Sequence, residues 1–517
     1  MNENRTQPAD KGWNFDPMTG RPILRTPPAL CRDAVFALLI FAGCLVFVNS
    51  ALYNGFAGGF VLAVWLLATA AILYLRGVLH FDLFGVVCLA ACLISAGSFA
   101  WYGETSMTFW KLLFILLSAS LFLVSATGAE QHLLADFRAF FAPFALFLRD
   151  ACPHLPMTAR AFFGKRRETR TAGRIVLGLL LAVPVVLLAG RWLVDADAAF
   201  DALVGGFRFD FGACMTTLIF GGLFFAFLFA FLFAARKGEL RAATRKETPC
   251  IPILDSLTAG IVLGAVSVLY LVYLLSQLSY LTGGFAGLRP EDMTFAAYAR
   301  RGFGEMCALC LFNLALVFFT RLFVRRDGER LPNALRVLVV FISGFSLFLI
   351  AAALAKMFLY IRTYGLTFLR LATSVFMFFL IFVFIAVAVK CFCERFAHIR
   401  VILLVGCVIA AAASVADLGA LTVNYNLYAY ESGLHETVDI DYFERCGDIA
   451  VPALVRLCDD EDSAVRYAAH QALRQLSNYR VERNLAARSV VSVRASRLLD
   501  ENLYEIFPEK GEAQLID

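Results

Sequence analysis

The chain has 517 residues, of which 60% are hydrophobic and 17% are charged, with a mean hydropathy of +0.73. A soluble protein carries roughly 25% charged residues, so this composition excludes an ordinary soluble domain and indicates an integral membrane protein. The net charge is +5, and no basic stripe of the kind that binds nucleic acid is present, so no nucleic-acid partner is expected.

Residues 1–33 are polar, contain Pro and Gly, and carry five basic side chains. We expect them to form a cytoplasmic tail. The apolar segment that follows could be mistaken for a signal peptide. However, the tail before it is long and the small-residue cleavage pattern after it is poor, which favours a retained first span.

Eleven apolar runs follow the tail. A helix needs about 20 apolar residues to cross a bilayer core of about 30 Å. The runs lie at 34–50, 56–75, 82–101, 109–127, 174–194, 211–235, 257–278, 303–324, 334–356, 367–389 and 399–417. They predict an all-α fold, a polytopic transmembrane helix bundle over residues 34–417, with the lipid bilayer as its partner. Because the first run is short and the third is weak, the prediction covers about 10 to 12 spans.

The positions of Lys and Arg predict the sidedness, because cytoplasmic loops are enriched in both. If the N-terminus lies inside and the spans alternate, the inside segments before residue 418 contain 23 Lys and Arg, and the outside loops contain five. This ratio favours eleven spans, an inside N-terminus and an outside C-terminus. An error of two cancelling spans would leave the ratio unchanged.

The longest predicted inside loop contains an apolar segment near 131–149 with charges at intervals and an interruption at Pro143. We interpret it as a helix lying in the cytoplasmic interface. The alternative is a twelfth, kinked span, against which Asp136 and Arg138 argue.

A small set of polar residues lies at the outer ends of the predicted spans or, for Asn313, near the middle of one. Ionisable residues at membrane depth are functional candidates. Arg300 and Arg301 oppose the positive-inside trend, and Glu305 can pair with Arg301 at helical spacing. The candidate outer polar site consists of Tyr298, Arg300, Arg301, Glu305, Asn313, Lys356, Arg362 and Arg370, and Asp417 closes the last span. The set is either an ion-pair network that fixes helices or a site for an anion or substrate. Snorkelling explains the basic residues equally well.

The segment from Tyr298 to Glu305 reads YARRGFGE. It resembles a signature of an uncharacterised bacterial family of multi-spanning membrane proteins, catalogued as domain of unknown function 4173, or of the related family 4153. The motif Asn424-Tyr425-Asn426 and the segments that begin at Asp439 and Ala450 are similar to that family's C-terminal region. The resemblance extends over residues 170–460. It implies a helical bundle in a bacterial inner membrane, and it implies no activity.

Residues 418–517 return to a soluble composition and are predicted to form an extracytoplasmic helical domain. Apolar residues from Val451 to Cys458 and from Val465 to Leu476 recur at helical spacing, and the hairpin resembles one HEAT-type repeat. One such unit cannot bury its apolar face alone, so residues 479–503 supply a second unit or the hairpin docks on the bundle or a partner. A protein partner is expected at 440–500, and the candidate partner surface consists of Arg456, Arg466 and Arg474. HEAT-type units are more familiar as cytoplasmic modules, which conflicts with the outside placement.

The sequence shows no pattern that points to catalysis or to a bound metal. Most of the 14 cysteines lie in apolar runs, where Cys acts as a small hydrophobic residue. Cys391 and Cys393 lack the second pair or nearby His that a zinc site needs. Because paired carboxylates, an H-E-x-x-H motif and a nucleophile motif are also missing, we predict no catalytic residue, metal ligand or cofactor. An enzyme acting on lipid-linked substrates has the least support.

Two functions therefore remain. The first is a membrane scaffold or sensor whose outer helical domain binds a partner. The alternative is a transporter or lipid-handling protein with an anion or substrate site at its outer mouth. Carboxylates are nearly absent from the span interiors, which weakens the transporter hypothesis, because coupled transporters usually place their sites near mid-membrane.

Overall fold

The computed structural model describes residues 14–15, 22–23, 31–53, 55–127, 155, 211–237, 254–285, 303–324, 331–393, 395–478 and 488–501. Within these ranges the chain is all-α, apart from the paired two-residue strands β1 (Asn14–Phe15) and β2 (Pro22–Ile23) and one bridge between Leu254 and Val324. The predicted fold class is confirmed.

Eight helices of the described ranges are long and apolar enough to cross a membrane. They are α1 (Cys31–Tyr53), α3 (Leu83–Tyr102), α4 (Thr108–Ala126), α8 (Phe211–Lys237), α10 (Ser256–Phe285), α13 (Asn333–Tyr364), α14 (Phe368–Phe392) and α15 (His398–Ala416). Two shorter apolar helices, α2 (Gly58–Tyr74) and α12 (Phe303–Phe323), coincide with the remaining predicted runs in these ranges. The chain is therefore a multi-pass integral membrane protein.

Two predicted segments lie outside the described residues: the span at 174–194 and the interfacial helix near 131–149. The total of eleven membrane spans therefore remains a prediction. Most helix bounds agree with the predicted runs, but α13 continues to Tyr364, well past the predicted end at 356. Its 32 residues span about 48 Å, more than the bilayer core of about 30 Å, so part of α13 extends beyond the hydrocarbon.

The described helices divide between two compact units. The first contains α8, α1 as far as Val48 and α2 from Leu67 onward. At one end of this unit the Tyr74 hydroxyl donates a 3.1 Å hydrogen bond to the buried carboxylate of Asp33, and the Arg236 guanidinium lies 4.7 Å above the Tyr74 ring. Aromatic contacts such as that of Phe41 with Phe225, with ring centroids 5.3 Å apart, pack α1 against α8.

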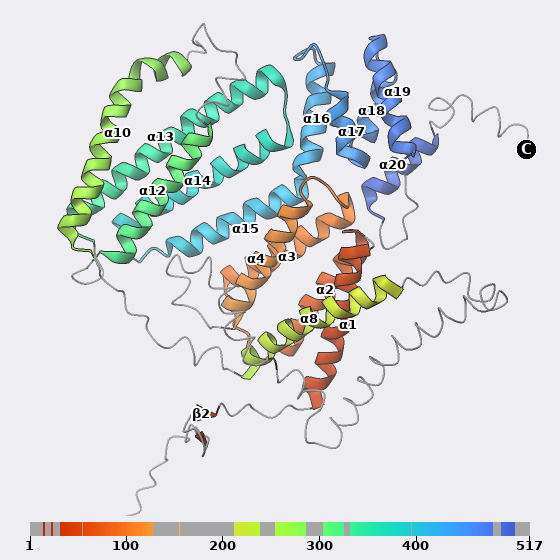
Figure 1. Cartoon of the computed structure of the whole chain (residues 1–517), viewed down its shortest axis with the longest axis horizontal. Coiled ribbons are helices and arrows are strands. Elements are labelled where there is room, and N and C mark those ends of the chain that lie inside the picture. The colour runs from red at the N-terminus through yellow and green to blue at the C-terminus, as the bar shows by residue number, and fades with distance from the viewer. Residues whose placement is uncertain are drawn as a thin grey trace, which may run out of the picture. The chain divides into compact units, whose positions relative to one another are not determined.

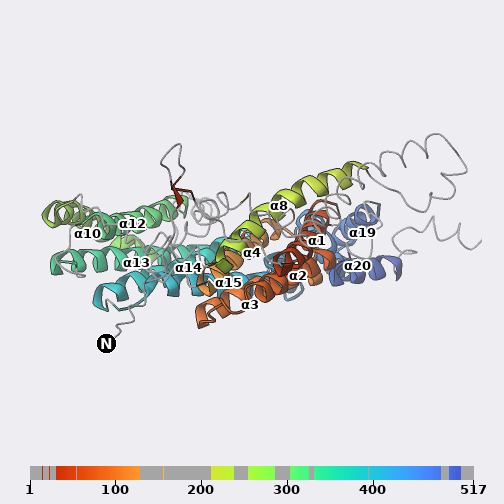
Figure 2. The ribbon, with the colours of Figure 1, turned by 90° about the horizontal axis from the view of Figure 1, so that it is seen from below.

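The second unit holds the other helices, and α13 is central to half of it. Helices α10, α12 and α14 pack against α13, α14 also packs against α15, and α15 packs against α3 and α4. Figure 1 and Figure 2 show α10, α12 and α13 together, and α15 beside α3 and α4. The outward faces carry large apolar side chains, for example Leu257 and Leu269 on α10 at 70% and 63% exposure, as expected of surfaces that face lipid.

The ends of these helices form two sets. The start of α10 meets the end of α12 through a 3.0 Å bond from the Leu254 amide to the Phe323 carbonyl, and His80 before α3 meets the end of α4 at Ala126. The opposite set contains the α3–α4 turn, the α13–α14 turn and the end of α15. In the pairs α3 and α4, α10 and α12, and α13 and α14, the two helices therefore run antiparallel, as alternating spans require.

The C-terminal helices α16 to α20 follow α15 and share one core. They are α16 (Leu418–Glu431), α17 (Ile440–Cys446), α18 (Val451–Leu457), α19 (Ser463–Asn478) and α20 (Val490–Glu501), with a 3-10 turn at Gly447–Ile449. Phe443, Leu454, Leu473 and Leu499 are buried in this core. The predicted hairpin is present as α18 and α19, and α20 covers α18.

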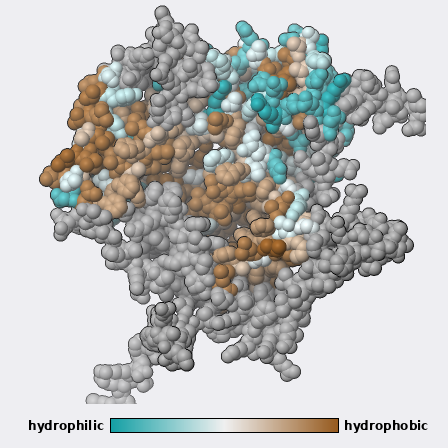
Figure 3. Space-filling view, in the orientation of Figure 1, coloured by the Kyte–Doolittle hydropathy of each residue, from teal (hydrophilic) through white to brown (hydrophobic). Residues whose placement is uncertain are grey.

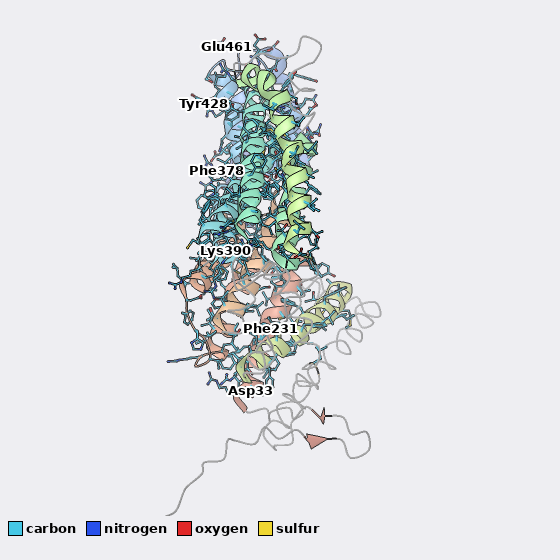
Figure 4. All side chains as sticks on the ribbon, turned by 90° about the vertical axis from the view of Figure 1, so that its left-hand side faces the viewer. Asp33, Phe231, Phe378, Lys390, Tyr428 and Glu461 are labelled. Atoms are coloured by element: carbon cyan, nitrogen blue, oxygen red, sulfur yellow. The ribbon has the colours of Figure 1, made fainter. Side chains whose placement is uncertain are left out.

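The surface changes character where these helices begin. Figure 3 shows hydrophobic surface over α10, α12 and α13 and hydrophilic surface over the region of α17 to α20. Figure 4 shows Tyr428 and Glu461 at the end of the long helices opposite to Lys390, with Phe378 between. The C-terminal helices thus lie at the helix ends farthest from Lys390, a residue of the predicted inside loop at 390–398.

Candidate functional site: a buried ion pair at a helix break

The most unusual polar feature of the described residues is an ion pair between α4 and the end of α15. The Lys111 ammonium lies 2.7 Å from Oδ2 of Asp417, and both side chains are completely buried. The Thr105 hydroxyl, in the turn between α3 and α4, donates a 2.9 Å hydrogen bond to the same oxygen. One carboxylate oxygen therefore joins the α3–α4 turn, α4 and the α15–α16 junction.

The second carboxylate oxygen of Asp417 caps the N-terminus of helix α16. Oδ1 accepts hydrogen bonds from the amides of Gly419, at 3.0 Å, and Ala420, at 3.3 Å, so Asp417 is the N-cap of α16. Its φ of 46° is the one positive φ of a non-glycine residue in the described ranges. Such a conformation costs about 1–3 kcal/mol and is found where surrounding contacts enforce it. Here the four hydrogen bonds that the Asp417 carboxylate accepts enforce a sharp break between α15 and α16.

The Lys111 ammonium is also enclosed by two aromatic rings of α3. It lies 5.3 Å from the ring centroid of Phe99 and 5.1 Å from that of Tyr102, within the range of cation–π attraction. The Tyr102 hydroxyl donates a 3.4 Å hydrogen bond to the carbonyl of Ala416. Helices α3, α4, α15 and α16 thus all contribute to the surroundings of one charge pair.

The energetics of this pair differ from those of an exposed one. Two buried charges together contribute little net stability, because desolvation offsets their attraction, but removal of one partner costs about 3–5 kcal/mol. The arrangement therefore resists any change that separates the two residues or neutralises one of them. The pair therefore forms a junction between α4 and the α15–α16 break that depends on both charges.

A second contact ties α16 to the turn between α13 and α14. The Asn426 side chain accepts a 2.8 Å hydrogen bond from the Leu366 amide and donates a 2.7 Å bond to the Leu366 carbonyl. The turn begins at Gly365, whose φ of 73° suits glycine. A Cβ there would come within 3.0 Å of the Asn426 amide oxygen, so the close approach also requires glycine.

A third contact comes from α17. The Tyr442 hydroxyl accepts a 3.0 Å hydrogen bond from the amide of Phe368, the first residue of α14. Burial raises the pKa of Tyr442 to about 12, so the hydroxyl stays neutral over the physiological range. Asn426 and Tyr442 both belong to the segments that resemble the family's C-terminal motifs, and the structure brings them to the same turn.

A fourth contact comes from α20. Ser489 and Ser492 cap this helix reciprocally, each hydroxyl accepting the amide hydrogen of the other at 3.1 and 2.9 Å. The Ser489 hydroxyl lies 3.0 Å from where a Cβ of Gly103 would be. The C-terminal helices therefore contact the ends of α3, α13, α14 and α15.

Asn313 lies in a separate, fully buried polar cluster in the α10–α12–α13 half. Its amide oxygen accepts a hydrogen bond from the Tyr270 hydroxyl, and its Nδ2 donates a 2.9 Å bond to Ser346. The Tyr270 ring stacks on Phe345 with centroids 4.1 Å apart. This cluster joins three membrane helices through satisfied polar groups, as expected of interhelical packing in a bilayer.

The described basic residues of the candidate outer site, Lys356, Arg362 and Arg370, do not all lie together. The Arg370 guanidinium lies 4.0 Å above the Tyr360 ring and donates to the carbonyls of Tyr364, at 2.9 Å, and Gly365. Lys356 precedes Tyr360 by one helical turn, so the two residues lie on the same side of α13. Arg362 is exposed and follows Tyr360 by two residues, so it lies on a different side of the helix. Arg362 also lies about 24 Å beyond Ser346 along α13, so Asn313 and Arg362 do not share a site.

Four members of the candidate outer site lie outside what the structure describes. Tyr298, Arg300 and Arg301 precede the described part of α12, and Glu305 lies in α12 with its side chain outside the description. They stay predictions.

The three arginines of the candidate partner surface are exposed on α18 and α19. Arg456 pairs with Glu431 at 2.7 Å, and Arg466 donates a 2.8 Å hydrogen bond to the carbonyl of Asp460. Arg474 lies two turns beyond Arg466 on the same side of α19.

Sequence reasoning identified Asp417 and missed Lys111. A lysine inside the fourth apolar run is itself a signal, because ionisable residues in spans are rare. No spacing rule, however, relates positions that are about 300 residues apart in the chain. Among the described residues no group of three or more His, Cys, Asp or Glu could hold a metal ion.

No curated protein and no solved structure matches the chain. A family model described as "Domain of unknown function (DUF4153)" matches residues 61–457, which is more than half of the chain. The match begins earlier than the predicted resemblance at 170–460, and it is to the second of the two families that the sequence resembles. It includes Lys111, Asp417, Asn426 and Tyr442. The chain therefore belongs to the DUF4153 family of proteins that contain this domain of unknown function.

Proposed function

We propose that the protein is a membrane scaffold or sensor whose C-terminal helices α16 to α20 bind a protein partner outside the cytoplasm of a bacterial cell. The observation that carries this proposal is the Lys111–Asp417 pair, which makes the start of α16 part of the membrane bundle. A domain that was attached to the last span only by a flexible linker would need no buried ion pair at the junction with that span.

The contacts at the α13–α14 turn support the same conclusion. Asn426 and Tyr442 use side-chain groups to bind backbone groups of residues 366 and 368. Loop backbone that is held in this way moves together with the helix that holds it. A partner that displaces the C-terminal helices would therefore act on the ends of α13, α14 and α15.

The partner surface is proposed on the exposed sides of α18 and α19. Tyr467 is 67% exposed beside Arg466, and Arg474 follows on the same helix. Tyr and Arg are enriched among the residues that dominate binding energy in interfaces. The basic side chains favour a partner segment with carboxylates.

The test is site-specific photocrosslinking in intact cells with the full-length chain. A photoreactive residue at position 467 is expected to give one discrete protein adduct, which Arg466→Glu with Arg474→Glu abolishes. The matched control position is 269 on α10, which is similarly exposed but apolar and is expected to crosslink to lipid. If position 467 gives no protein adduct while the chain is present at normal levels, the scaffold proposal fails.

The alternative, transport or lipid handling, is supported by one observation. Residues 331–393 contain no Asp or Glu, yet Lys356, Arg362 and Arg370 lie toward the same end of α13 and α14. Such a region would attract an anion or an acidic headgroup. If Arg300→Ala with Arg301→Ala and, separately, Arg370→Gln leave every transport and lipid phenotype unchanged, this alternative is wrong.

A further inference from the structure

We propose that a binding site for an anionic phospholipid lies where α12 ends, α13 begins and α14 ends. Its three cations are Arg321 on α12, Arg336 on α13 and Lys390 on α14. They bind the phosphodiester of a headgroup that has a net negative charge. This inference goes beyond the proposed partner surface on α18 and α19 and does not depend on it.

Helix packing brings the three cations to one end of one bundle. Helix α13 packs against both α12 and α14. Val324, Leu335 and Cys391 belong to one buried apolar cluster, and each cation lies within three positions of one of them along the chain. Figure 4 shows Lys390 at this end of the long helices. The three cations therefore border the same apolar cluster.

Both guanidinium groups are partly buried between the helices. Nη1 of Arg321 and Nε of Arg336 are buried atoms. Both groups interact electrostatically with the thiol of Cys391 on α14, and Arg336 also donates from Nη2 to the side chain of Asn333. A snorkelling arginine extends its charged head into water, whereas these two arginines keep part of theirs inside the bundle.

The hydrogen bonding of Arg336 is incomplete. Its buried Nε–H group has no acceptor among the described residues, and a buried donor of a charged group is costly when it lacks an acceptor. The described parts of α12, α13 and α14 contain one acidic residue, Glu305, which lies at the opposite end of α12. Asp255, before α10, is exposed. A phosphate oxygen supplies the missing acceptor, because the planar guanidinium group matches the geometry of phosphate.

Exposed apolar side chains beside the cations favour a lipid over a free anion. Phe319, Val337 and Phe392 each lie within two positions of one of the cations and are more than half exposed. The acyl chains of a phospholipid cover such side chains, and a free phosphate ion does not. The loop at 390–398 is predicted to lie inside, and basic pockets between membrane helices on the cytoplasmic side bind acidic headgroups.

The net charge of the headgroup decides the selectivity of the site. Phosphatidylethanolamine carries an ammonium group beside its phosphodiester, and binding would place this ammonium near three further cations. Phosphatidylglycerol carries the same phosphodiester without an ammonium. Since like charges repel most strongly where water is excluded, we expect the site to prefer phosphatidylglycerol.

The experiment is native mass spectrometry of the full-length chain released from detergent micelles. Phosphatidylglycerol and phosphatidylethanolamine with identical acyl chains are added at equal concentrations. For the wild-type chain we expect the first bound lipid to be phosphatidylglycerol with a preference of about tenfold, which corresponds to about 1.4 kcal/mol. Equal occupancy by the two lipids overturns the proposal.

Substitutions locate the site. Arg336→Gln and Arg321→Gln, singly and together, should abolish the preference, because glutamine is polar but uncharged. Arg362→Gln is the matched control, because Arg362 is exposed near the other end of the same helix, and it should retain the preference. If the control loses as much as Arg336→Gln, the lipid responds to overall charge and the proposed site is wrong. Should the arginine variants fail to fold, Lys390→Gln provides the same test at the third cation.

A competition measurement distinguishes a lipid from free phosphate. A large excess of inorganic phosphate should not displace phosphatidylglycerol, because it offers no acyl chains to the exposed apolar side chains. Displacement would show that the site takes a free anion, and the lipid proposal would be wrong. The absence of an adduct at position 467 would contradict the partner surface alone and would leave the lipid preference unchanged.

Discussion

At the residue scale, the buried charges of this protein depend on one another. Lys111 and Asp417 are each 0% exposed and lie 2.7 Å apart, while Arg456 and Glu431 form an equally short pair at 63% and 37% exposure. The distance is the same, but water screens only the second pair. The two pairs therefore form a natural comparison of the same interaction in two environments.

Removal of one member of the buried pair should be strongly destabilising. We expect Lys111→Met or Asp417→Asn alone to lower the free energy of unfolding by about 3–5 kcal/mol, and the double variant to lie close to the wild-type chain. The measurement is reversible denaturation in mixed micelles, analysed as a double-mutant cycle. The control cycle with Arg456→Met and Glu431→Gln should show about 0–1 kcal/mol. Equal coupling energies in the two cycles would contradict this account.

The Tyr442 hydroxyl predicts an alkaline limit for the attachment of α17. Its pKa rises from 10.0 to about 12 because it is buried. A group whose pKa is raised on folding stabilises the fold below its unfolded pKa, so this contribution is complete below pH 10.0 and is lost as the pH rises through about 12. We expect a loss of α17 protection in that window, measured by hydrogen exchange. Tyr442→Phe should remove this part of the pH dependence, whereas Tyr428→Phe, at a 63% exposed position, should retain it.

At the scale of elements, the protein holds its C-terminal helices through turns and not through long helical faces. The α13–α14 turn is bound by Asn426 and Tyr442, and the α3–α4 turn is bound by Asp417 and approached by Ser489. Turn backbone has amide and carbonyl groups that helices do not satisfy, and these must find partners where water is excluded. Polar side chains at such positions give specificity that apolar packing alone does not.

The Asn426 contact can be broken without a change in size. Asn426→Asp can still accept from the Leu366 amide, but it places a negative charge against the Leu366 carbonyl in place of a donor. We expect a loss of about 1–3 kcal/mol in the stability of the C-terminal helices, detected as faster limited proteolysis within α16 to α19. Asn424→Asp, at an exposed position two residues earlier, is the matched control and should change nothing. A similar effect of both substitutions would mean that negative charge alone is responsible.

At the scale of the whole molecule, the helix ends of the second unit fall into two opposite sets. This arrangement helps to assign the side of the membrane on which the C-terminal helices lie. Tyr428 and Glu461 lie at the ends opposite to Lys390 (Figure 4). If the positive-inside rule holds for the loop at 390–398, the C-terminal helices lie outside the cytoplasm.

The side of the C-terminus can be measured directly. Reporters that are active only inside or only outside the cytoplasm would be fused after Asp517 and after Tyr425, and a third after Ala242 in the predicted inside loop. We expect outside activity at the first two positions and inside activity at the third. Inside activity at all three positions would show that the predicted number of spans is wrong by one and would place α16 to α20 in the cytoplasm.

The class of this protein, two candidate families of which one matches, and the positions of most membrane helices followed from the amino-acid sequence alone. Apolar runs of bilayer length are a local property, so ten of the eleven predicted runs coincide with helices of the described ranges. The ends of helices were harder to predict, as α13 shows, because a helix continues into the interface for as long as polar caps and packing permit. The apolar spacing in residues 451–476 likewise predicted α18 and α19. The N-terminus of α19 is capped by Asp462, which accepts a 2.8 Å hydrogen bond from the Ala464 amide.

Which polar residues contact one another could be known only from the folded structure. Sequence spacing relates residues within one helix. It therefore predicted that a set of residues lies at the outer ends of the spans, but not which of them are in contact: Lys356, Arg362, Arg370 and Asp417. Folding joined Asp417 to a lysine about 300 residues earlier, joined Asn313 to Tyr270 and Ser346, and separated Arg362 from Asn313. The physical reason is that a buried charge must be compensated by whatever group the packing of helices brings near it, and that group has no fixed distance along the chain.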